Sequence, residues 1–312
     1  MVTSKGNGGV HGAFGHDFTA VAEALAPFRD KNPVYVPPPG NAGDALIAAN
    51  TYRFFQAIGL KVEHGYYRHA YPGRHIIFGG GGNLVPYYGE TRGFIERHIG
   101  SLKSFVLLPH TVRENKDLLA MFDARFHVFA REQKTYDHLR AATSKARVGM
   151  GHDMAFFATP HDAAQSPVVG LAKRACNPRG LRFDIRQFRT WKNAVAERRK
   201  RLETYPPKGP VLNAFRNDVE TAGRPVPKGN LDVSEHFMHL RDHGPFMSRQ
   251  IVGAMIELVS RYETIRTDRL HIAVLAALMG KDVEAQDNIY GKLGLIRSTS
   301  MEDLNNVRFV SA

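Results

Sequence analysis

The 312-residue chain contains a single cysteine, Cys176, and no long run of apolar residues. One thiol can form neither a disulfide framework nor a cysteine metal site, so the sequence favours a reducing compartment, the cytoplasm. No stretch approaches the roughly 18–20 apolar residues that a membrane-spanning helix requires. Residues 1–17 are rich in glycine and lack the apolar segment of a signal peptide, so they are expected to form a flexible N-terminal arm.

Several common functional motifs are also missing. The chain has no zinc-finger spacing, no RNP pattern and no interleaving of aromatic with basic residues, which argues against a nucleic-acid partner. It has no Gly-x-Ser-x-Gly elbow, so covalent hydrolase chemistry has no support. Although 15 histidines are present, no His-Glu-x-x-His motif occurs, and His152 next to Asp153 is an isolated pair. No metal site is therefore predicted.

The chain does have a net charge of +12 and a hydrophobic content of 43%, which is enough to build a core. Such a charge points to anionic partners, either a membrane surface or phosphorylated small molecules if nucleic acid is set aside. The basic run at residues 198–201 lies in an amphipathic stretch that precedes two prolines. It forms either the solvent-exposed face of a helix or a contact with an anionic membrane or a lipid pyrophosphate.

Short apolar runs alternate with segments of helical periodicity, which is typical of an α/β fold with parallel sheets. The expected strands are 34–36, 61–64, 75–78, 104–108, 126–129, 147–150, 211–215, 264–267 and 283–285. The expected helices are 18–28, 45–58, 88–99, 115–122, 131–139, 248–261 and 269–279. The alternation weakens between the two groups, and the length suits two domains, predicted at 18–160 and 210–312 with an interdomain region at 161–209.

Two glycine-rich turns, at residues 40–44 and 79–83, each follow an expected strand. Ligands of parallel sheets bind beyond the carboxyl ends of the strands, so both turns are expected along one rim. The first turn matches neither the dinucleotide fingerprint nor a P-loop, and its Asp44 is either a helix cap or a base. The four glycines of the second turn form either a tight crossover or a close approach of the backbone to a ligand.

The segment 264–280 reads as a strand, a turn and a helix. Asp268 is expected at the N-cap and Gly280 at the C-cap. Arg269 and His271 then fall in the first helical turn, where free N–H groups and the helix dipole favour anions. The alternative is structural: Asp268 only caps the helix, Arg269 pairs with a surface acid and His271 is a satisfied, half-buried histidine.

Six fragments, taken in order, resemble the polysaccharide pyruvyltransferase family. They are 40–44, 78–84, 129–132, 153–156, 267–271 and 287–292. The resemblance implies two Rossmann-like domains facing across a cleft (GT-B-like), with the acceptor on the N-terminal side and phosphoenolpyruvate on the C-terminal side. It also implies a bacterial transferase that moves pyruvate from phosphoenolpyruvate onto a sugar of an exopolysaccharide precursor, forming a ketal and releasing phosphate.

The same resemblance implies donor-site residues. Arg269, Leu270 and His271 match the family's phosphoenolpyruvate-binding triplet, and either Arg131 or Arg216 is expected as a second arginine. His271 can supply a proton, and Asp44 and Asp268 are candidate bases. The further substrate-binding candidates come from the two glycine turns: Gly40, Asn41, Gly43, Gly80, Gly81, Gly82 and Asn83. No cofactor is expected, because phosphoenolpyruvate is a co-substrate.

The expected acceptor is a lipid-linked saccharide, which would bring the protein to the anionic inner face of the membrane as a peripheral protein. Two other functions stay open. The same architecture could serve a sugar-nucleotide-dependent glycosyltransferase, since fold does not fix function. A non-catalytic basic protein that binds an anionic polymer or membrane would also carry this net charge.

Overall fold

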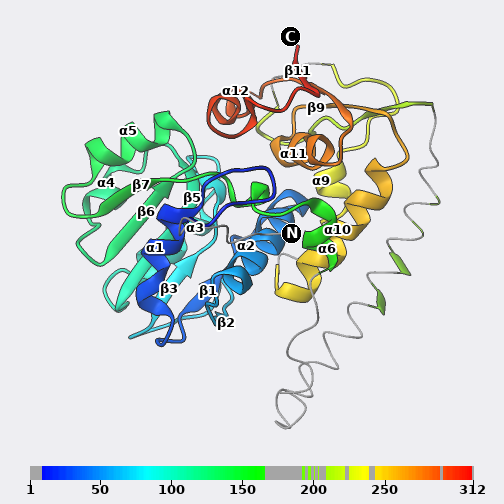
Figure 1. The fold of residues 1–312 in the computed structure, drawn as a ribbon. Helices are drawn as coiled ribbons and strands as arrows, with labels where there is room; N and C mark the ends of the chain where they lie inside the picture. The colour runs from blue at the N-terminus through cyan, green and yellow to red at the C-terminus, as the bar shows by residue number, and fades with distance from the viewer. Residues whose placement is uncertain are drawn as a thin grey trace.

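The computed structural model describes residues 9–165, 209–221, 225–238, 243–288 and 291–310, with isolated positions between 192 and 203. These residues form two parallel sheets flanked by helices (Figure 1). The α/β class with parallel sheets is therefore confirmed. Arg198, Arg199 and Arg201 of the basic run lie outside the described residues, as does most of the predicted interdomain region.

The larger sheet has seven strands in the order β2-β1-β3-β5-β6-β7, with β4 paired to β5 beside that path. The strands are β1 (Val34–Val36), β2 (Glu63–His64), β3 (His75–Phe78), β4 (Gly81–Leu84), β5 (Ser104–Val112), β6 (Phe126–Ala130) and β7 (Arg147–Met150). All but one of the nine residues of β5 are buried, as expected for a strand covered on both faces. Because β5 is long, its first half pairs with β3 and its second half pairs with β4.

The smaller sheet has four parallel strands in the order β11-β10-β9-β8. They are β8 (Val211–Asn213), β9 (Thr264–Thr267), β10 (Asp282–Ala285) and β11 (Val307–Phe309). The helices of this half are α9 (Val233–His236), α10 (Pro245–Val259), α11 (Leu270–Leu278) and α12 (Lys292–Ile296), the last followed by a π-turn at Arg297–Met301. Gly280, with a φ of +73°, ends α11 as the sequence predicts.

The helices of the first half are α1 (Thr19–Leu25), α2 (Ala42–Ala57), α3 (Glu90–His98), α4 (Lys116–Ala120), α5 (Gln133–Ala142) and α6 (Pro160–Gln165), with 3₁₀ turns at Ala26–Phe28 and Met154–Phe156. Helix α2 lies between the two sheets and packs against α10, α11, α6 and α9 (Figure 1). One continuous cluster of buried apolar side chains accordingly runs from the first half into the second.

Several details differ from the sequence-based prediction. Helix α2 begins at Ala42 rather than near residue 45, and α10 begins at Pro245, three residues before the expected start. Strands β4 and β11 and helices α9 and α12 were not predicted. Their sequences are short or rich in glycine, so periodicity carries little signal there.

The N-terminal arm is described only from residue 9 onward, and residues 9–17 pack onto the rest of the molecule. The amide of Ala13 donates to the carbonyl of Phe157 (2.9 Å), and His16 Nε2 lies 2.9 Å from the carbonyl oxygen of Ser300. These contacts join the arm to both halves of the chain. Within the described ranges, none of the helices has the length and apolarity that crossing a membrane would take.

Candidate functional site

A cavity of about 240 Å³ lies where the carboxyl ends of strands from both sheets meet. Its walls come from the turn after β1, from β4 and from the segments that follow β8, β9 and β10. This is where open parallel sheets bind ligands. The acidic and basic lining residues are Asp44, Glu90, Arg216, Asp218, Glu220, Glu235, Arg269, His271 and Lys292.

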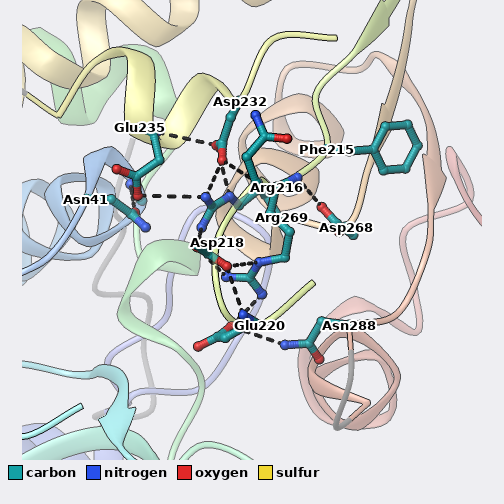
Figure 2. A network of polar contacts seen from close by, with 12 residues as sticks. Asn41, Phe215, Arg216, Asp218, Glu220, Asp232, Glu235, Asp268, Arg269 and Asn288 are labelled. Carbon is teal, nitrogen blue, oxygen red and sulfur yellow. Dashed lines mark hydrogen bonds and ion pairs between the residues drawn. The ribbon is translucent and has the colours of Figure 1, made fainter. Parts of the chain in front are cut away.

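Arg269 is the N-cap residue of α11, and its side chain is held by carboxylates. Its guanidinium binds Asp232 through two nitrogens, with Nε donating to Oδ1 at 3.0 Å, and its Nη1 lies 2.7 Å from Asp218 Oδ2 (Figure 2). Asp232 is itself fixed as the N-cap of α9. Burial opposes the charged form of Arg269, but these carboxylates outweigh it and raise the pKa. Arg269 therefore pairs with two carboxylates of the site, Asp232 and Asp218, and not with a single acid at the surface.

Arg216 lies beside Arg269 and shares Asp218 with it. Arg216 Nε donates to Asp218 Oδ1 at 2.8 Å, and Nη1 pairs with Glu220 (Figure 2). Each guanidinium uses three of its five N–H donors in these contacts, and Arg269 Nη2 also lies 3.7 Å from Glu235 Oε1, which leaves two donors on Arg216 and at least one on Arg269 for a ligand. Two fixed arginines at one wall of a cavity suit a ligand with phosphate or carboxylate groups.

His271 projects from the first turn of α11 and is 11% exposed. Its Nε2 lies 3.4 Å from Asp153 Oδ2, and Asp153 is paired in turn with Arg131 Nη1 at 2.5 Å. Burial favours the protonated acid, but Arg131, His271 and the amide of Ala155 together outweigh it and lower the pKa of Asp153. The other ring nitrogen, Nδ1, lies against Gly43, where an added Cβ would come within 2.7 Å. A carboxylate that orients an imidazole is the arrangement of general acid–base sites.

Arg131 is fully buried and is not among the described residues that line the cavity. Its Nε donates to Thr111 Oγ1 at 2.8 Å, while its Nη2 has no hydrogen-bond partner among the described residues. A Cβ on Gly82 would lie 2.5 Å from that Nη2. Arg131 therefore lies directly beneath the part of the cavity wall that Gly82 forms. Arg216 is the arginine that the structure brings to Arg269.

Lys292 reaches the cavity from the start of α12. Its backbone amide donates to Asn288 Oδ1 at 3.0 Å, and Asp287 Oδ1 accepts from the amide of Leu293, so these two side chains hold the first residues of α12. Its Nζ lies 3.7 Å from Glu220, and the side chain is 13% exposed. Burial disfavours the ammonium form and lowers the pKa of Lys292 to about 8.

The first glycine turn forms a capping box at the start of α2. Asn41 accepts from the amide of Gly43 at 2.9 Å, and Asp44 accepts from the amide of Asn41 at 3.0 Å. An added Cβ on Gly40 would come within 1.8 Å of Asp44, so glycine is required there. Asp44 is thus a helix cap, and it also lines the cavity together with Gly40 and Asn41.

The second glycine turn serves packing at three of its four positions. An added Cβ would come within 2.2 Å of Pro38 at Gly79 and within 2.7 Å of the carbonyl oxygen of Pro109 at Gly80, and Gly81 has a φ of +141°. Of this turn only Gly82 and Asn83 are among the described lining residues. The structure therefore uses Gly80 and Gly81, two of the expected substrate-binding residues, for close backbone packing.

Asn83 is fixed by its neighbours. Its Nδ2 donates to the carbonyl of Pro39, and its amide donates to His110 Nε2 at 3.2 Å. Burial lowers the pKa of His110 to about 3, so the ring is neutral. Because Nε2 accepts, the proton is on Nδ1 and faces the carbonyl of Gly79. Asn83 is therefore held in place for contact with a ligand.

The prediction that Asp268 caps α11 is wrong, because Arg269 is the N-cap residue and β9 ends at Thr267. Asp268 Oδ1 instead accepts from the backbone amide of Arg216 at 2.8 Å. It lines a separate pocket of about 110 Å³ behind Arg216, and burial raises its pKa. Asp268 thus fixes the backbone that carries Arg216, while Leu270 lines the main cavity as expected.

Sequence reasoning missed several charged residues of the site: Asp153, Asp218, Glu220, Asp232, Glu235 and Lys292. Two of them stood at the ends of fragments that carry the family resemblance, Asp153 and Lys292, and that position was the available signal. The acids that bind the arginines follow no short-range pattern. Among the residues that the structure describes, no group of three or more His, Cys, Asp or Glu is placed to hold a metal ion.

Comparison with known proteins gives three findings. The profile of the family described as polysaccharide pyruvyl transferase matches residues 41–283. The chain is 26% identical over 292 residues to a protein of Bacillus subtilis (strain 168) named as a candidate pyruvyl transferase, EpsO, covering 87% of this chain and 85% of that protein. The crystal structure of a functionally uncharacterised protein of Klebsiella pneumoniae subsp. pneumoniae NTUH-K2044 is similar with a TM-score of 0.68 and 27% identity, covering 94% of this chain and 98% of the other.

Proposed function

Because the chain belongs to the polysaccharide pyruvyl transferase family and is a transferase, we propose that its pyruvyl donor is phosphoenolpyruvate, bound in the cavity between the two sheets. The observation that carries this proposal is the grouping of Arg216, Arg269 and Lys292 on the cavity wall with His271 beside them. Phosphoenolpyruvate offers a phosphate and a carboxylate to these cations and a methylene carbon to an acid.

In the proposed complex, the unused N–H groups of Arg216 and Arg269 and the ammonium of Lys292 bind the phosphate and the carboxylate. The lining carboxylates outnumber these cations, so a bound anion needs direct contact with the guanidinium edges. The acids fix the arginines in one orientation before the donor arrives, which reduces the entropy lost on binding.

The chemistry requires a proton at the methylene carbon and a nucleophile at its neighbour. His271 Nδ1 gives its proton to the methylene carbon, which becomes a methyl group, while Asp153 holds the ring through Nε2. A sugar hydroxyl attacks the adjacent carbon and gives its proton to Asp44. The bond from that carbon to the phosphate oxygen breaks, and the phosphate leaves with the proton from Asp44.

A second hydroxyl of the same sugar then attacks the same carbon and closes the ketal, and its proton returns to His271. Protons balance, because the two hydroxyls lose two protons, of which one replaces the proton given to the methyl group and one leaves with phosphate. Asp44 is suited to the base role because it lines the cavity and its carboxylate is fixed by the amide of Asn41.

We also propose that the two sheets belong to Rossmann-like domains of the GT-B type, since each is parallel and each contributes strand ends to one cavity. A lipid-linked acceptor is proposed on the ground that a net charge of +12 favours approach to an anionic membrane face. The acceptor would then meet the protein at the cytoplasmic side of the membrane.

The test measures phosphate release from phosphoenolpyruvate in the presence of lipid-linked saccharides. Arg269→Ala is expected to lower kcat/KM about 100-fold because it removes charge-assisted contacts, and His271→Ala to lower kcat about 100-fold or more because it removes the acid. The matched control is Arg266→Ala, an exposed arginine on β9 that pairs with Glu284 outside the cavity. Turnover within a few-fold of wild type in both site variants would disprove the assignment.

Thermal melts separate this function from the alternatives. Phosphoenolpyruvate is expected to raise the Tm of the wild type and not that of Arg269→Ala. Stabilisation by a nucleotide sugar in its place would favour a glycosyltransferase. Salt-sensitive binding to anionic polymer without any phosphate release would favour a non-catalytic protein.

A further inference from the structure

A second depression lies beside the cavity on the side of the larger sheet, with a volume of about 700 Å³. It is lined chiefly by aromatic and charged side chains, Tyr67, Arg68, Tyr87, Tyr88, Glu90 and Arg97. We call it the tyrosine groove. Tyr88 and Glu90 line both the groove and the cavity, so the two are continuous.

Tyr67, one of the three tyrosines of the groove, is held by two arginines. Arg68 Nε donates to the hydroxyl of Tyr67 at 2.8 Å, and its guanidinium lies 5.3 Å from the centre of that ring. Arg97 Nη2 donates to the backbone carbonyl of Tyr67 at 2.6 Å. Tyr87 is 50% exposed, which is high for a large aromatic side chain, and belongs to the loop before α3.

Tyr88 connects the groove to the arginine side of the cavity. It lines the cavity together with Glu220, the carboxylate that pairs with Arg216. Burial and the neighbouring acids raise the pKa of Tyr88, so the phenol keeps its proton. A ligand lying over Tyr88 would therefore extend from the groove to the donor site.

Tyrosine rings with arginine and carboxylate groups beside them are suited to binding a sugar. The C–H face of a pyranose ring packs on an aromatic ring, and its hydroxyls pair with arginine and carboxylate groups in the same plane. A pyrophosphate has no apolar face for the tyrosines to cover, and it would meet the carboxylate of Glu90.

We propose that the tyrosine groove binds the sugar residues next to the one that receives pyruvate, so that this enzyme acts on an oligosaccharide chain. This proposal rests on the proposed function for the reaction itself. The chain would lie over Tyr87 and Tyr67, with its terminal sugar between Tyr88 and Glu90 and its hydroxyls directed into the donor cavity.

The probes are depyruvylated fragments of the exopolysaccharide secreted by the producing strain, separated by size into monosaccharide and tetrasaccharide fractions. The wild type is expected to have a KM for the tetrasaccharide that is about tenfold below that for the monosaccharide. Tyr87→Ala and Arg97→Ala should each raise the tetrasaccharide KM about threefold to tenfold and leave the KM for phosphoenolpyruvate unchanged. Tyr87→Phe keeps the ring and should retain the wild-type value.

The matched control for Arg97 is Arg140→Ala on α5, an exposed arginine away from the groove. Binding of the tetrasaccharide is also followed directly by saturation-transfer NMR without phosphoenolpyruvate, so the groove is tested independently of turnover. An enzyme that turns over phosphoenolpyruvate while both groove variants keep the wild-type tetrasaccharide KM and NMR contacts would overturn the proposal. Loss of NMR contacts in Tyr87→Ala from a protein that never releases phosphate would support the groove and refute pyruvyl transfer from phosphoenolpyruvate.

Discussion

Replacement of Lys292 by methionine tests the charge of the donor site most directly. Lys292 lies on the cavity wall with its Nζ 3.7 Å from Glu220, and burial lowers its pKa to about 8. Its charge therefore changes within the range where the protein can be assayed. Methionine has a similar volume and no charge, so the substitution removes the ammonium with little change in packing.

The size of the effect follows from the pKa. With a pKa of about 8, about nine-tenths of Lys292 is charged at pH 7 and about one-tenth at pH 9. If only the ammonium form binds the donor, the KM for phosphoenolpyruvate rises about tenfold between these two values. The donor's phosphate has already lost its second proton by pH 7, since that pKa is about 6. Phosphoenolpyruvate is therefore expected to bind more weakly as the pH rises through 8.

The assay is the KM for phosphoenolpyruvate from phosphate release at pH 7, 8 and 9. In the wild type, the KM for phosphoenolpyruvate should rise with pH. In Lys292→Met it should not change with pH and should be at least as high as that of the wild type at pH 9. In Lys292→Arg the side chain stays charged, so the KM should not change with pH either. Parallel profiles for wild type and Lys292→Met would refute the reasoning, because the pH dependence would then belong to another group.

Three further substitutions test the residues that hold the site in place. Asp153→Asn should lower kcat about 100-fold through the imidazole it orients, and should cost about 3–5 kcal/mol in urea unfolding by leaving Arg131 unpaired. Gly82→Ala should raise the donor KM, because its methyl group would lie 3.0 Å from Lys292 Nζ and displace that ammonium, whereas Gly89→Ala, with nothing within 4 Å, should not. Asn41→Ala should cost about 1 kcal/mol in urea unfolding by removing the cap of α2.

Local patterns were enough to predict most of the fold. Alternating apolar runs gave the order of strands and helices, and the segment after β9 placed Arg269 and His271 at the start of a helix. Strand β4 could not be predicted, because Gly-Gly-Asn-Leu has little strand propensity and forms a strand only where the long β5 offers an unpaired edge.

The partners of the site residues could not be predicted from the sequence, for a different reason. Asp232 lies 37 residues from the Arg269 that it binds, and Asp153 lies 118 residues from His271. No periodicity connects positions so far apart. Asp232 meets Arg269 because β8 pairs with β9 in the smaller sheet, and Asp153 meets His271 because the two halves of the chain pack together. Which of Arg131 and Arg216 lies beside Arg269 likewise depended on which strand ends next to β9.

The shared apolar core around α2 restricts how this enzyme can move. Two lobes that swing open about a hinge need an interface that separates at little cost, but here α2 packs against α10 and α11, and the buried cluster is continuous across it. Opening by rigid rotation would expose that core to water. We therefore expect one cooperative transition in calorimetry, and substrate entry and phosphate exit through rearrangement of side chains and loops at the rim while the two sheets stay together.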